Sequence, residues 1–282
     1  MRLLTTLLGL MATMTALPAA AQEGLEIIGT PIDRGIGFQP AVTELARDIH
    51  FLDGLLLWII TPICLFVIGL MGYSMLRHNR RANPTPATFT HNSPLEVAWT
   101  IIPIVILIFI GTFSLPVLFK QQEIPAADIT IKVTGYQWYW GYEYVDHDFG
   151  FESFLVARDE LEDYGYSDRD WLLATDTAVV VPVGKTIVMQ ITAADVIHAW
   201  TIPAFGVKQD AVPGRLAELW FNAEREGVYF GQCSELCGKD HAYMPITVKV
   251  VSQEVYDDWL KGAIDEYADA GASAEFQVAA LN

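Results

Sequence analysis

One short stretch of the sequence contains several residues with affinity for soft metal ions. Cys233 and Cys237 lie four residues apart, His241 follows four residues later, and Met244 three residues after that. Thiolate and thioether sulfur select copper(I), and imidazole suits both oxidation states of copper. A mononuclear blue-copper site uses one cysteine, two histidines and a weak axial methionine. Two cysteines, with a second imidazole available at His198, instead suit two copper ions bridged by two sulfurs with one histidine on each.

Each of these residues, taken alone, has a simpler interpretation. Cys233 and Cys237 could form a disulfide, because the spacing is short and the compartment predicted below is oxidising. They could also hold zinc, although structural zinc sites usually add a second pair of cysteines or histidines. Met244 alone is more typical of core packing, and His198 alone of a hydrogen-bonded structural histidine. The joint occurrence of these ligand types favours copper.

The composition indicates which kind of protein must position these ligands. The chain has 282 residues, of which 52% are hydrophobic and 18% charged, and its mean hydropathy is +0.30. These values predict membrane segments and exclude intrinsic disorder. Three cysteines are too few for a disulfide-stapled scaffold. The formal charge of −17 argues against nucleic acid as a partner, because phosphate contacts need lysine and arginine.

Three apolar segments occur in the first 120 residues. Residues 1–21 have a basic start, a short apolar run and an Ala-x-Ala end, which predict a secretory signal peptide cleaved after Ala21 rather than an anchor helix. The runs 55–76 and 97–119 carry no formal charge. As helices they would be roughly 33–35 Å long, enough to cross a hydrocarbon core of about 30 Å. We therefore expect two membrane spans.

The segment between these spans carries the basic residues Arg77, Arg80 and Arg81. By the positive-inside rule this loop is cytoplasmic, so both ends of the mature chain lie outside. A cleaved signal peptide requires the same outside N-terminus. The prediction is a membrane protein whose C-terminal part lies outside the cytoplasm. The first 120 residues contain as many basic as acidic residues, so the whole net charge falls on residues 121–282.

The sequence pattern changes after Lys120 from long apolar runs to short alternating ones. Short segments rich in valine, isoleucine and aromatic residues are bounded by turn residues, which predicts a β-sandwich or barrel. These segments are 129–133, 178–181, 186–192, 217–221, 228–230 and 246–251. Residues 253–268 have apolar positions near helical spacing after Ser252, a suitable N-cap, and predict a C-terminal helix.

Four stretches closely resemble subunit II of aa3-type cytochrome c oxidases. They are 135–140 (GYQWYW), 198–203 (HAWTIP), 210–215 (DAVPGR) and the 233–244 loop. The resemblance covers nearly the whole chain and implies an α+β fold, in which a two-helix transmembrane hairpin precedes a cupredoxin-like Greek-key β-sandwich or barrel. It divides the chain into signal peptide 1–21, outer-face segment 22–54, first span 55–76, cytoplasmic loop 77–96, second span 97–119, copper domain 120–252, and C-terminal helix and tail 253–282.

The resemblance also implies a set of metal ligands. Cys233 and Cys237 would bridge the two ions of a binuclear copper A centre, with His198 and His241 as terminal ligands. The remaining weak ligands would be Met244 to one copper and the backbone carbonyl of Glu235 to the other. The Glu235 carboxylate would bind magnesium at the boundary with subunit I, a role that suits an oxygen ligand. Haem would be present only in the partner subunit.

The same resemblance implies roles for two further residues. Trp138 would receive electrons from cytochrome c, although the sequence alone does not separate it from Trp140. Glu96 would lie near the mouth of the K proton pathway of subunit I. A local interpretation is also sufficient for Glu96, because Ser93, Pro94 and Glu96 fit a capping box with Ser93 as N-cap.

The acidic C-terminal part suits a basic electron donor. We expect Glu143, Glu152, Asp163 and Asp195 to contribute to docking of cytochrome c, although any one of them could simply be a solvated surface acid. The implied function is that of a proton-translocating cytochrome c oxidase subunit. The chain would accept electrons at copper A and pass them to haem in subunit I for oxygen reduction. Its partners would be cytochrome c, subunit I, the other oxidase subunits and the lipid bilayer. The resemblance places the chain in the bacterial inner membrane, with both mature termini and the copper domain on the periplasmic side.

Two alternatives come from other functional classes. A membrane-tethered copper chaperone of thioredoxin type also uses a Cys-x₃-Cys motif and a distant histidine, but it would show βαβ units and would not need His241 and Met244. A structural subunit of a quinol oxidase would keep the fold without the copper ligands. The complete ligand set favours the cytochrome c oxidase.

Overall fold

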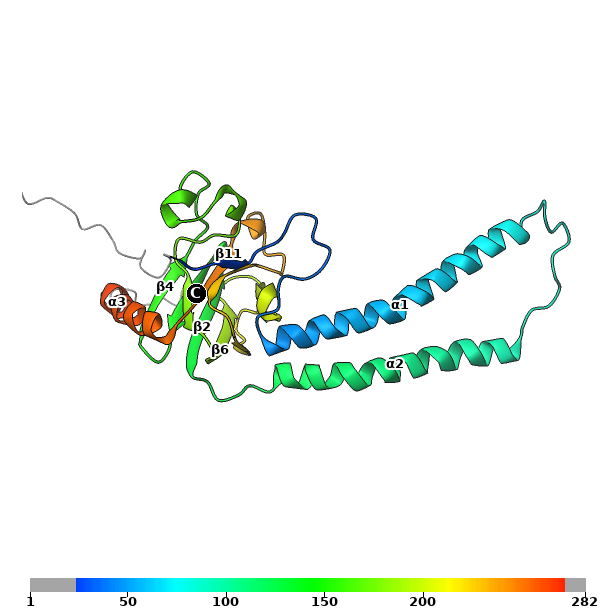
Figure 1. Ribbon diagram of the computed structural model, residues 1–282, viewed down its shortest axis with the longest axis horizontal. Helices are drawn as coiled ribbons and strands as arrows, with labels where there is room; N and C mark the ends of the chain where they lie inside the picture. The colour runs from blue at the N-terminus through cyan, green and yellow to red at the C-terminus, as the bar shows by residue number, and fades with distance from the viewer. Residues whose placement is uncertain (1–23, 272–282) are drawn as a thin grey trace, which may run out of the picture.

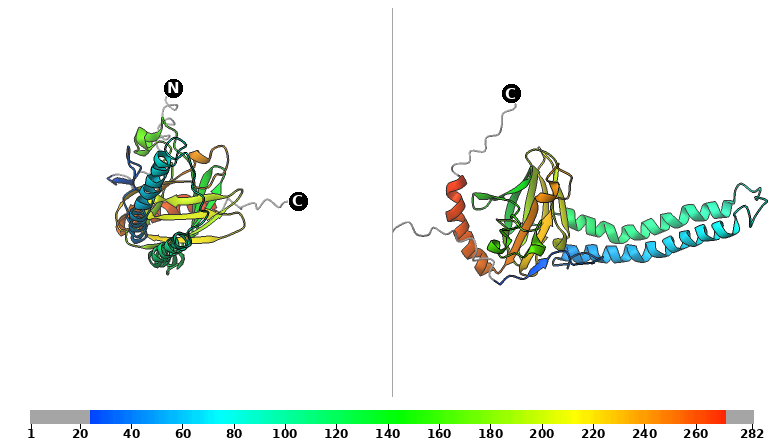
Figure 2. Two further views of the ribbon diagram at one scale, coloured as in Figure 1. Left: turned by 90° about the vertical axis from the view of Figure 1, so that its right-hand side faces the viewer. Right: turned by 90° about the horizontal axis from the view of Figure 1, so that it is seen from above.

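The computed structural model describes residues 24–271 and has two parts, a long helical hairpin and a β-domain at its open end (Figure 1). The predicted signal peptide and the end of the C-terminal tail lie outside the described residues. The expected α+β architecture, with two apolar helices followed by a β-sandwich, is confirmed. Figure 2 shows the two helices running side by side away from the β-domain.

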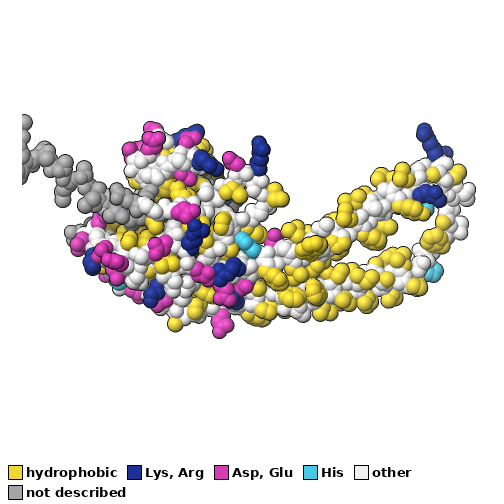
Figure 3. All heavy atoms as spheres, viewed as in Figure 1, with side chains coloured by type: hydrophobic (Ala, Val, Ile, Leu, Met, Phe, Trp, Pro, Cys, Tyr) yellow, Lys and Arg dark blue, Asp and Glu magenta, His cyan; other side chains and the backbone are white. Residues whose placement is uncertain are grey.

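The hairpin consists of α1 (Glu44–Arg77) and α2 (Ser93–Gln122), and both are long and apolar enough to cross a membrane. None of the residues in their most apolar windows is buried within the chain. Figure 3 shows hydrophobic side chains along the outer surface of both helices. Because such a surface is unstable in water, lipid and neighbouring subunits must cover it. The chain is a membrane protein with two spans.

The first helix begins eleven residues before the charge-free run that starts at Leu55. Thr43 is its N-cap and accepts a hydrogen bond from the Ala46 backbone N–H. The Thr43 hydroxyl also donates to the carbonyl of Phe205 in the β-domain, and Arg47 forms an ion pair with Glu224. These contacts fasten the first turns of α1 to the β-domain.

The predicted N-cap of the second helix was wrong by one residue. Asn92, not Ser93, is the N-cap, and its side chain accepts a hydrogen bond from Leu95 N–H. Asparagine is at least as good an N-cap as serine. The Asn92 N–H in turn donates to Glu96 Oε1 over 3.4 Å, so Glu96 does contribute to the capping of α2.

Two main sheets and one smaller sheet form the β-domain. The five-stranded sheet has the order β4-β3-β2-β6-β9, with β2 (Ile129–Tyr136), β3 (Tyr139–Tyr144), β4 (Phe149–Ser153), β6 (Thr186–Ala193) and β9 (Ala217–Asn222). The four-stranded sheet has the order β1-β10-β11-β5, with β1 (Ile27–Gly29), β5 (Val179–Pro182), β10 (Gly227–Gln232) and β11 (Pro245–Val251). A separate pair contains β7 (His198–Ile202) and β8 (Val207–Ala211).

The core lies between these sheets. In β2, the alternation of Ile129, Ile131 and Val133 buries one side of the strand, as a period of two residues requires. Strand β11 is buried at every position. One of its faces lies in the main core, and on the other the Thr247 hydroxyl contacts the carbonyl of Leu173 in the excursion between β4 and β5. That excursion contains the short helices η2 (Leu161–Tyr164) and η3 (Asp168–Asp170).

The N-terminal segment belongs to the β-domain as much as to the hairpin. Strand β1 pairs in parallel with β10 at the edge of its sheet. Further along, Val42 N–H donates to the Ala204 carbonyl, and the Val42 carbonyl accepts from Glu224 N–H. The chain is therefore fixed to the β-domain immediately before it enters the first span.

The last helix, α3 (Gln253–Gly271), packs against β4 and β5, which are edge strands of the two main sheets, and closes the core between them. Ser252 is its N-cap, as predicted, because its hydroxyl accepts from Val255 N–H over 3.3 Å. The ring of Trp259 contacts Tyr144 and Phe149. This packing stabilises β3, the strand that follows the turn carrying Trp138.

Candidate metal centre

The loop from Cys233 to Met244 connects two adjacent antiparallel strands. Strand β10 ends at Gln232 and β11 begins at Pro245, and these two residues are partners in the register. The loop ends are therefore held together by the sheet, and its last part is the short helix η5 (His241–Tyr243). The antiparallel pair thus fixes the loop at both ends.

His198 reaches this loop from another strand. It is the first residue of β7, and β7 lies against β10 so closely that a Cβ on Gly231 would overlap the carbonyl of Thr201. The Ser234 N–H also donates to the Ala199 carbonyl over 3.0 Å. Glycine at position 231 therefore allows the close contact that brings the two parts of the site together.

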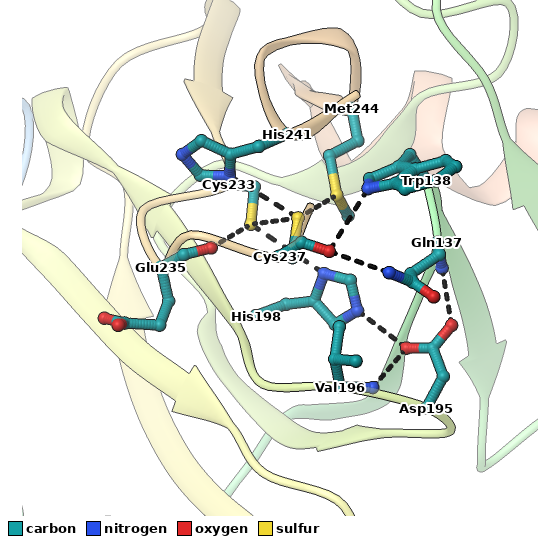
Figure 4. A network of polar contacts seen from close by, with 10 residues as sticks. All are labelled: Gln137, Trp138, Asp195, Val196, His198, Cys233, Glu235, Cys237, His241 and Met244. Carbon is teal, nitrogen blue, oxygen red and sulfur yellow. Dashed lines mark hydrogen bonds and ion pairs between the residues drawn. The ribbon is translucent and has the colours of Figure 1, made fainter. Parts of the chain in front are cut away.

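The five predicted side-chain ligands converge on one small volume (Figure 4). The sulfur atoms of Cys233 and Cys237 are 3.8 Å apart. His198 Nδ1 lies 3.9 Å from Cys233 Sγ, while His241 Nδ1 lies 3.5 Å from Cys237 Sγ. Met244 Sδ is also 3.5 Å from Cys237 Sγ. Each cysteine thus has its own histidine, and the ligand atoms of His198, Cys233 and Cys237 lie within 4.8 Å of one another, as in a metal site.

Glu235 presents its two polar groups to different surroundings. Its backbone carbonyl oxygen lies 3.3 Å from Cys233 Sγ. Its side chain is exposed and points away from the sulfur atoms (Figure 4). The carbonyl is therefore available to a metal at the cluster, and the carboxylate is available to a second ion or a neighbouring subunit.

The electrostatics of the two thiols differ. Burial opposes ionisation of Cys233, but hydrogen bonds with His198 and with backbone groups outweigh it and lower the pKa of this thiol to about 7. Burial, together with the charge of the neighbouring Cys233, raises the pKa of Cys237 to about 12. Because the two sulfur atoms are 3.8 Å apart, ionisation of both thiols requires a cation to balance the second negative charge. A metal ion supplies that cation.

Asp195 positions His198, a role that the sequence analysis did not predict. Its Oδ1 lies 2.9 Å from His198 Nε2, and its Oδ2 accepts from the Gln137 backbone N–H over 2.7 Å. Burial lowers the pKa of His198, but hydrogen bonds with Cys233 and Asp195 outweigh it and raise the pKa above its ordinary value. A carboxylate on the far nitrogen turns the near nitrogen toward the metal. The one sequence signal that could have indicated this contact is the three-residue spacing between Asp195 and His198.

Both candidate tryptophans donate hydrogen bonds to backbone carbonyls of the loop, but they differ in exposure. The indole of Trp138 donates to the Cys237 carbonyl over 3.3 Å and is partly exposed. The indole of Trp140 donates to the Met244 carbonyl over 3.2 Å and is completely buried. Gln137 strengthens the first contact, because its side chain also donates to the Cys237 carbonyl, over 2.8 Å.

The remaining predicted site residues occupy different parts of the molecule. Glu152 hydrogen-bonds to Tyr139, next to Trp138, and after burial it is the main cause that raises the pKa of Tyr139 to about 12. Glu143 forms an ion pair with Lys132, and Asp163 lies in η2 on the separate excursion. Glu96 lies at the end of the hairpin remote from the β-domain (Figure 1). Cys64 is exposed on α1 and does not pack within the chain.

Comparison with known proteins gives the same family for both parts of the chain. Residues 129–251 match the family model "Cytochrome C oxidase subunit II, periplasmic domain", and residues 31–117 match the corresponding transmembrane domain. Cytochrome c oxidase subunit 2 of Cereibacter sphaeroides is 61% identical over 269 residues, covering 90% of this chain and 88% of the relative. A probable cytochrome c oxidase subunit 2 of Rickettsia felis is 45% identical, covering 82% of this chain and 72% of that one.

Solved structures are also similar to this chain. The periplasmic domain of cytochrome oxidase subunit II of Bradyrhizobium japonicum is 50% identical, with a TM-score of 0.47, and covers 51% of this chain and 99% of that chain.

Proposed function

The chain belongs to the cytochrome c oxidase subunit II family and is a subunit of that oxidase; on this premise we propose that its β-domain holds a binuclear copper A centre. The side chains of Cys233, Cys237, His198 and His241 would hold the two ions. Met244 and the carbonyl of Glu235 complete the site. When bound, the copper pair accepts and donates single electrons.

The observation that carries this proposal is the pairing of each thiol with its own imidazole. Two sulfurs 3.8 Å apart can both contact two metal ions. Each histidine lies beside a different one of these sulfurs. Two thiolates, two imidazoles and a thioether form a soft donor set that fits copper better than magnesium or calcium. The β-sandwich holds these ligands on adjacent strands and a short closed loop, so little movement accompanies a change of charge at the site.

We propose that Trp138 receives the electron from cytochrome c. Its partial exposure lets a donor approach, and its hydrogen bond to the Cys237 carbonyl joins it to a bridging ligand. Trp140 lacks the first property, because it is completely buried. Glu143, Glu152, Asp163 and Asp195 attract the basic donor, with Glu152 and Asp195 on or beside the turn that carries Trp138.

The orientation of the chain is also part of the proposal. The loop that joins α1 to α2 carries Arg77, Arg80 and Arg81, so it lies in the cytoplasm and the β-domain lies in the periplasm. Glu96, partly exposed at the start of α2, is then on the side from which subunit I takes up protons. The exposed carboxylate of Glu235 binds magnesium together with subunit I.

The two alternative functions fit the molecule less well. A thioredoxin-type copper chaperone requires βαβ units, whereas the described chain between β2 and β11 has successive strands joined by loops and short 3₁₀ helices. His241 and Met244 would have no reason to converge on the thiols in such a chaperone. A quinol-oxidase-type structural subunit would not need a complete set of copper ligands.

Metal analysis of the full-length chain, expressed without partner subunits and loaded with copper in detergent, tests the copper proposal. We expect two copper ions per chain, an intense purple colour and a mixed-valence electron paramagnetic resonance signal. One copper per chain, or a signal of an isolated copper(II) ion, would contradict a binuclear centre. Reduction of the loaded centre by reduced cytochrome c tests the donor separately.

A further inference from the structure

A single lysine lies against the indole proposed to receive electrons. Lys239 Nζ is 5.4 Å from the centre of the Trp138 ring, a distance at which a cation is attracted to the face of an indole. The Lys239 side chain is 77% exposed. Its ammonium group therefore both covers part of Trp138 and faces any protein that docks there.

The loop backbone places Lys239 in this position. Gly238, the preceding residue, has φ of +130°, a conformation that side chains disfavour. A Cβ on Gly238 would lie only 3.0 Å from Trp138 Cζ2 and 3.1 Å from Gln137 Nε2. Glycine thus lets the loop lie directly on the indole, and the next residue projects over the ring.

The charge of Lys239 contrasts with its surroundings. Burial raises the pKa of Tyr136, and the charges of Glu143, Glu152 and Asp195 raise it further, so these three charges act together on the turn between β2 and β3. Asp195 also holds the Gln137 backbone, immediately before Trp138. Lys239 forms an ion pair of 3.3 Å with its neighbour Asp240, and both side chains are at least 40% exposed. An ion pair this exposed leaves the lysine charge available to a partner.

We propose that Lys239 is a specificity-determining residue for the electron donor. It places one positive charge at Trp138, near the acids Glu152 and Asp195. The charge therefore repels a donor that brings a basic residue to Trp138 and attracts one that brings an acidic group there. This inference rests on the proposed function and adds the charge pattern expected of the electron donor.

The physical reason is repulsion between like charges at short range. A docked pose that brings a donor lysine to Lys239 is unfavourable, whereas the same lysine is attracted by Glu152 or Asp195. Lys239 does not hold Trp138 in place by itself, because the indole also donates to the Cys237 carbonyl and contacts Gly238. Removing the charge should therefore change donor selection without moving the indole.

The test uses the intact oxidase and compares Lys239→Met, which keeps the length of the side chain, with Lys239→Glu and with the charge-retaining control Lys239→Arg. Reduction of the copper centre is followed by stopped flow at low ionic strength with two donors, a basic and an acidic c-type cytochrome. With the basic donor we expect Lys239→Met to react about 1.5-fold to fivefold faster, as for the loss of one exposed charge pair. With the acidic donor it should react more slowly by a similar factor.

Lys239→Glu should exaggerate both changes, Lys239→Arg should match the wild type, and all differences should shrink at high salt. Equal rates for all variants with both donors, or the same direction of change with both donors, would overturn the inference while the copper assignment stands. An unchanged copper spectrum in every variant confirms that the site is intact. If neither cytochrome reduces wild-type copper, the proposed donor function fails, and the inference fails with it.

Discussion

The hairpin and the β-domain are both rich in apolar side chains, but they place them in opposite environments. In the β-domain Trp140, Trp200 and Phe221 are completely buried. In the hairpin Phe66 and Leu107 are about two-thirds exposed within the chain. The β-domain therefore completes its own core, whereas the hairpin surface is completed by lipid and by other oxidase subunits.

This difference explains where the chemistry can be located. A metal site requires ligands held within a fraction of an ångström, and the β-domain supplies adjacent strands and a closed loop for that purpose. The hairpin supplies attachment, through the contacts of Thr43 and Arg47 with the β-domain. If this division is correct, equivalent substitutions in the two regions should have unequal effects.

The two regions each contain free cysteine, and this gives the largest expected effect. Cys233→Ser should abolish the mixed-valence signal, because one remaining thiolate cannot bridge both metals in the same way. Cys64→Ser, on the exposed surface of α1, should leave copper content and signal unchanged. Copper analysis and electron paramagnetic resonance of both variants check the prediction. Two coppers with a normal signal in Cys233→Ser would refute the ligand assignment.

A matched pair of phenylalanines tests the difference in packing. Phe221 is completely buried between the rings of Trp200 and Phe205, so Phe221→Ala should lower the free energy of unfolding of the β-domain by about 3–5 kcal/mol. Phe66→Ala, in the middle of α1, should leave that free energy unchanged within error. Denaturant unfolding of the full-length chain, followed by loss of copper absorbance, gives both values. Equal effects would mean that the β-domain is not an independent core.

Substitutions of two methionines distinguish a ligand role from a packing role. Met244→Leu conserves side-chain volume, so we expect a loss of stability below about 1.5 kcal/mol together with a changed copper spectrum and slower transfer to haem. Met71→Leu, on the exposed face of α1, should change neither the spectrum nor the transfer. An unchanged spectrum in Met244→Leu would show that the thioether 3.5 Å from Cys237 Sγ is packing only.

The sequence was sufficient to predict the side chains that cluster at the candidate site and six of the strands, because both have local signals. Ligand type and spacing identified Cys233, Cys237, His241 and Met244, and alternation identified strands such as β2 and β6. It did not predict β3, β4, β7 and β8. It also missed β1, which has only three residues and pairs with a strand about 200 residues later. Its pairing is a tertiary effect that no local pattern indicates.

The same limit applies to the beginning of the first helix and to Asp195. Glu44, Arg47 and Asp48 interrupt the apolar pattern, and their helical state depends on contacts with the β-domain and the end of α2, such as the pairs Arg47–Glu224 and Lys120–Asp48. Asp195 was predicted only as a docking acid, because composition gives its charge but not its neighbour. The hydrogen bond to His198 depends on the turn that precedes β7.

The smallest expected effect concerns the acidic residues outside the metal site, and it extends the comparison of the two regions from packing to charge. Glu152 hydrogen-bonds to Tyr139 beside Trp138, Asp163 lies on the excursion, and Glu123 lies exposed where α2 meets the β-domain. Charges near the contact raise the association rate most, and salt screens the effect over about 10 Å at 0.1 M. We therefore expect Glu152→Gln to slow copper reduction by basic cytochrome c about twofold to fivefold at low salt, as for one exposed charge pair. Asp163→Asn should slow it less, and the matched control Glu123→Gln least.

Stopped-flow measurements across a salt series should show the three rates converging as salt rises, while oxygen reduction at the haem remains normal. An equal loss of rate in all three variants would mean that only the net charge of the domain attracts the donor, and that no local surface around Trp138 does so.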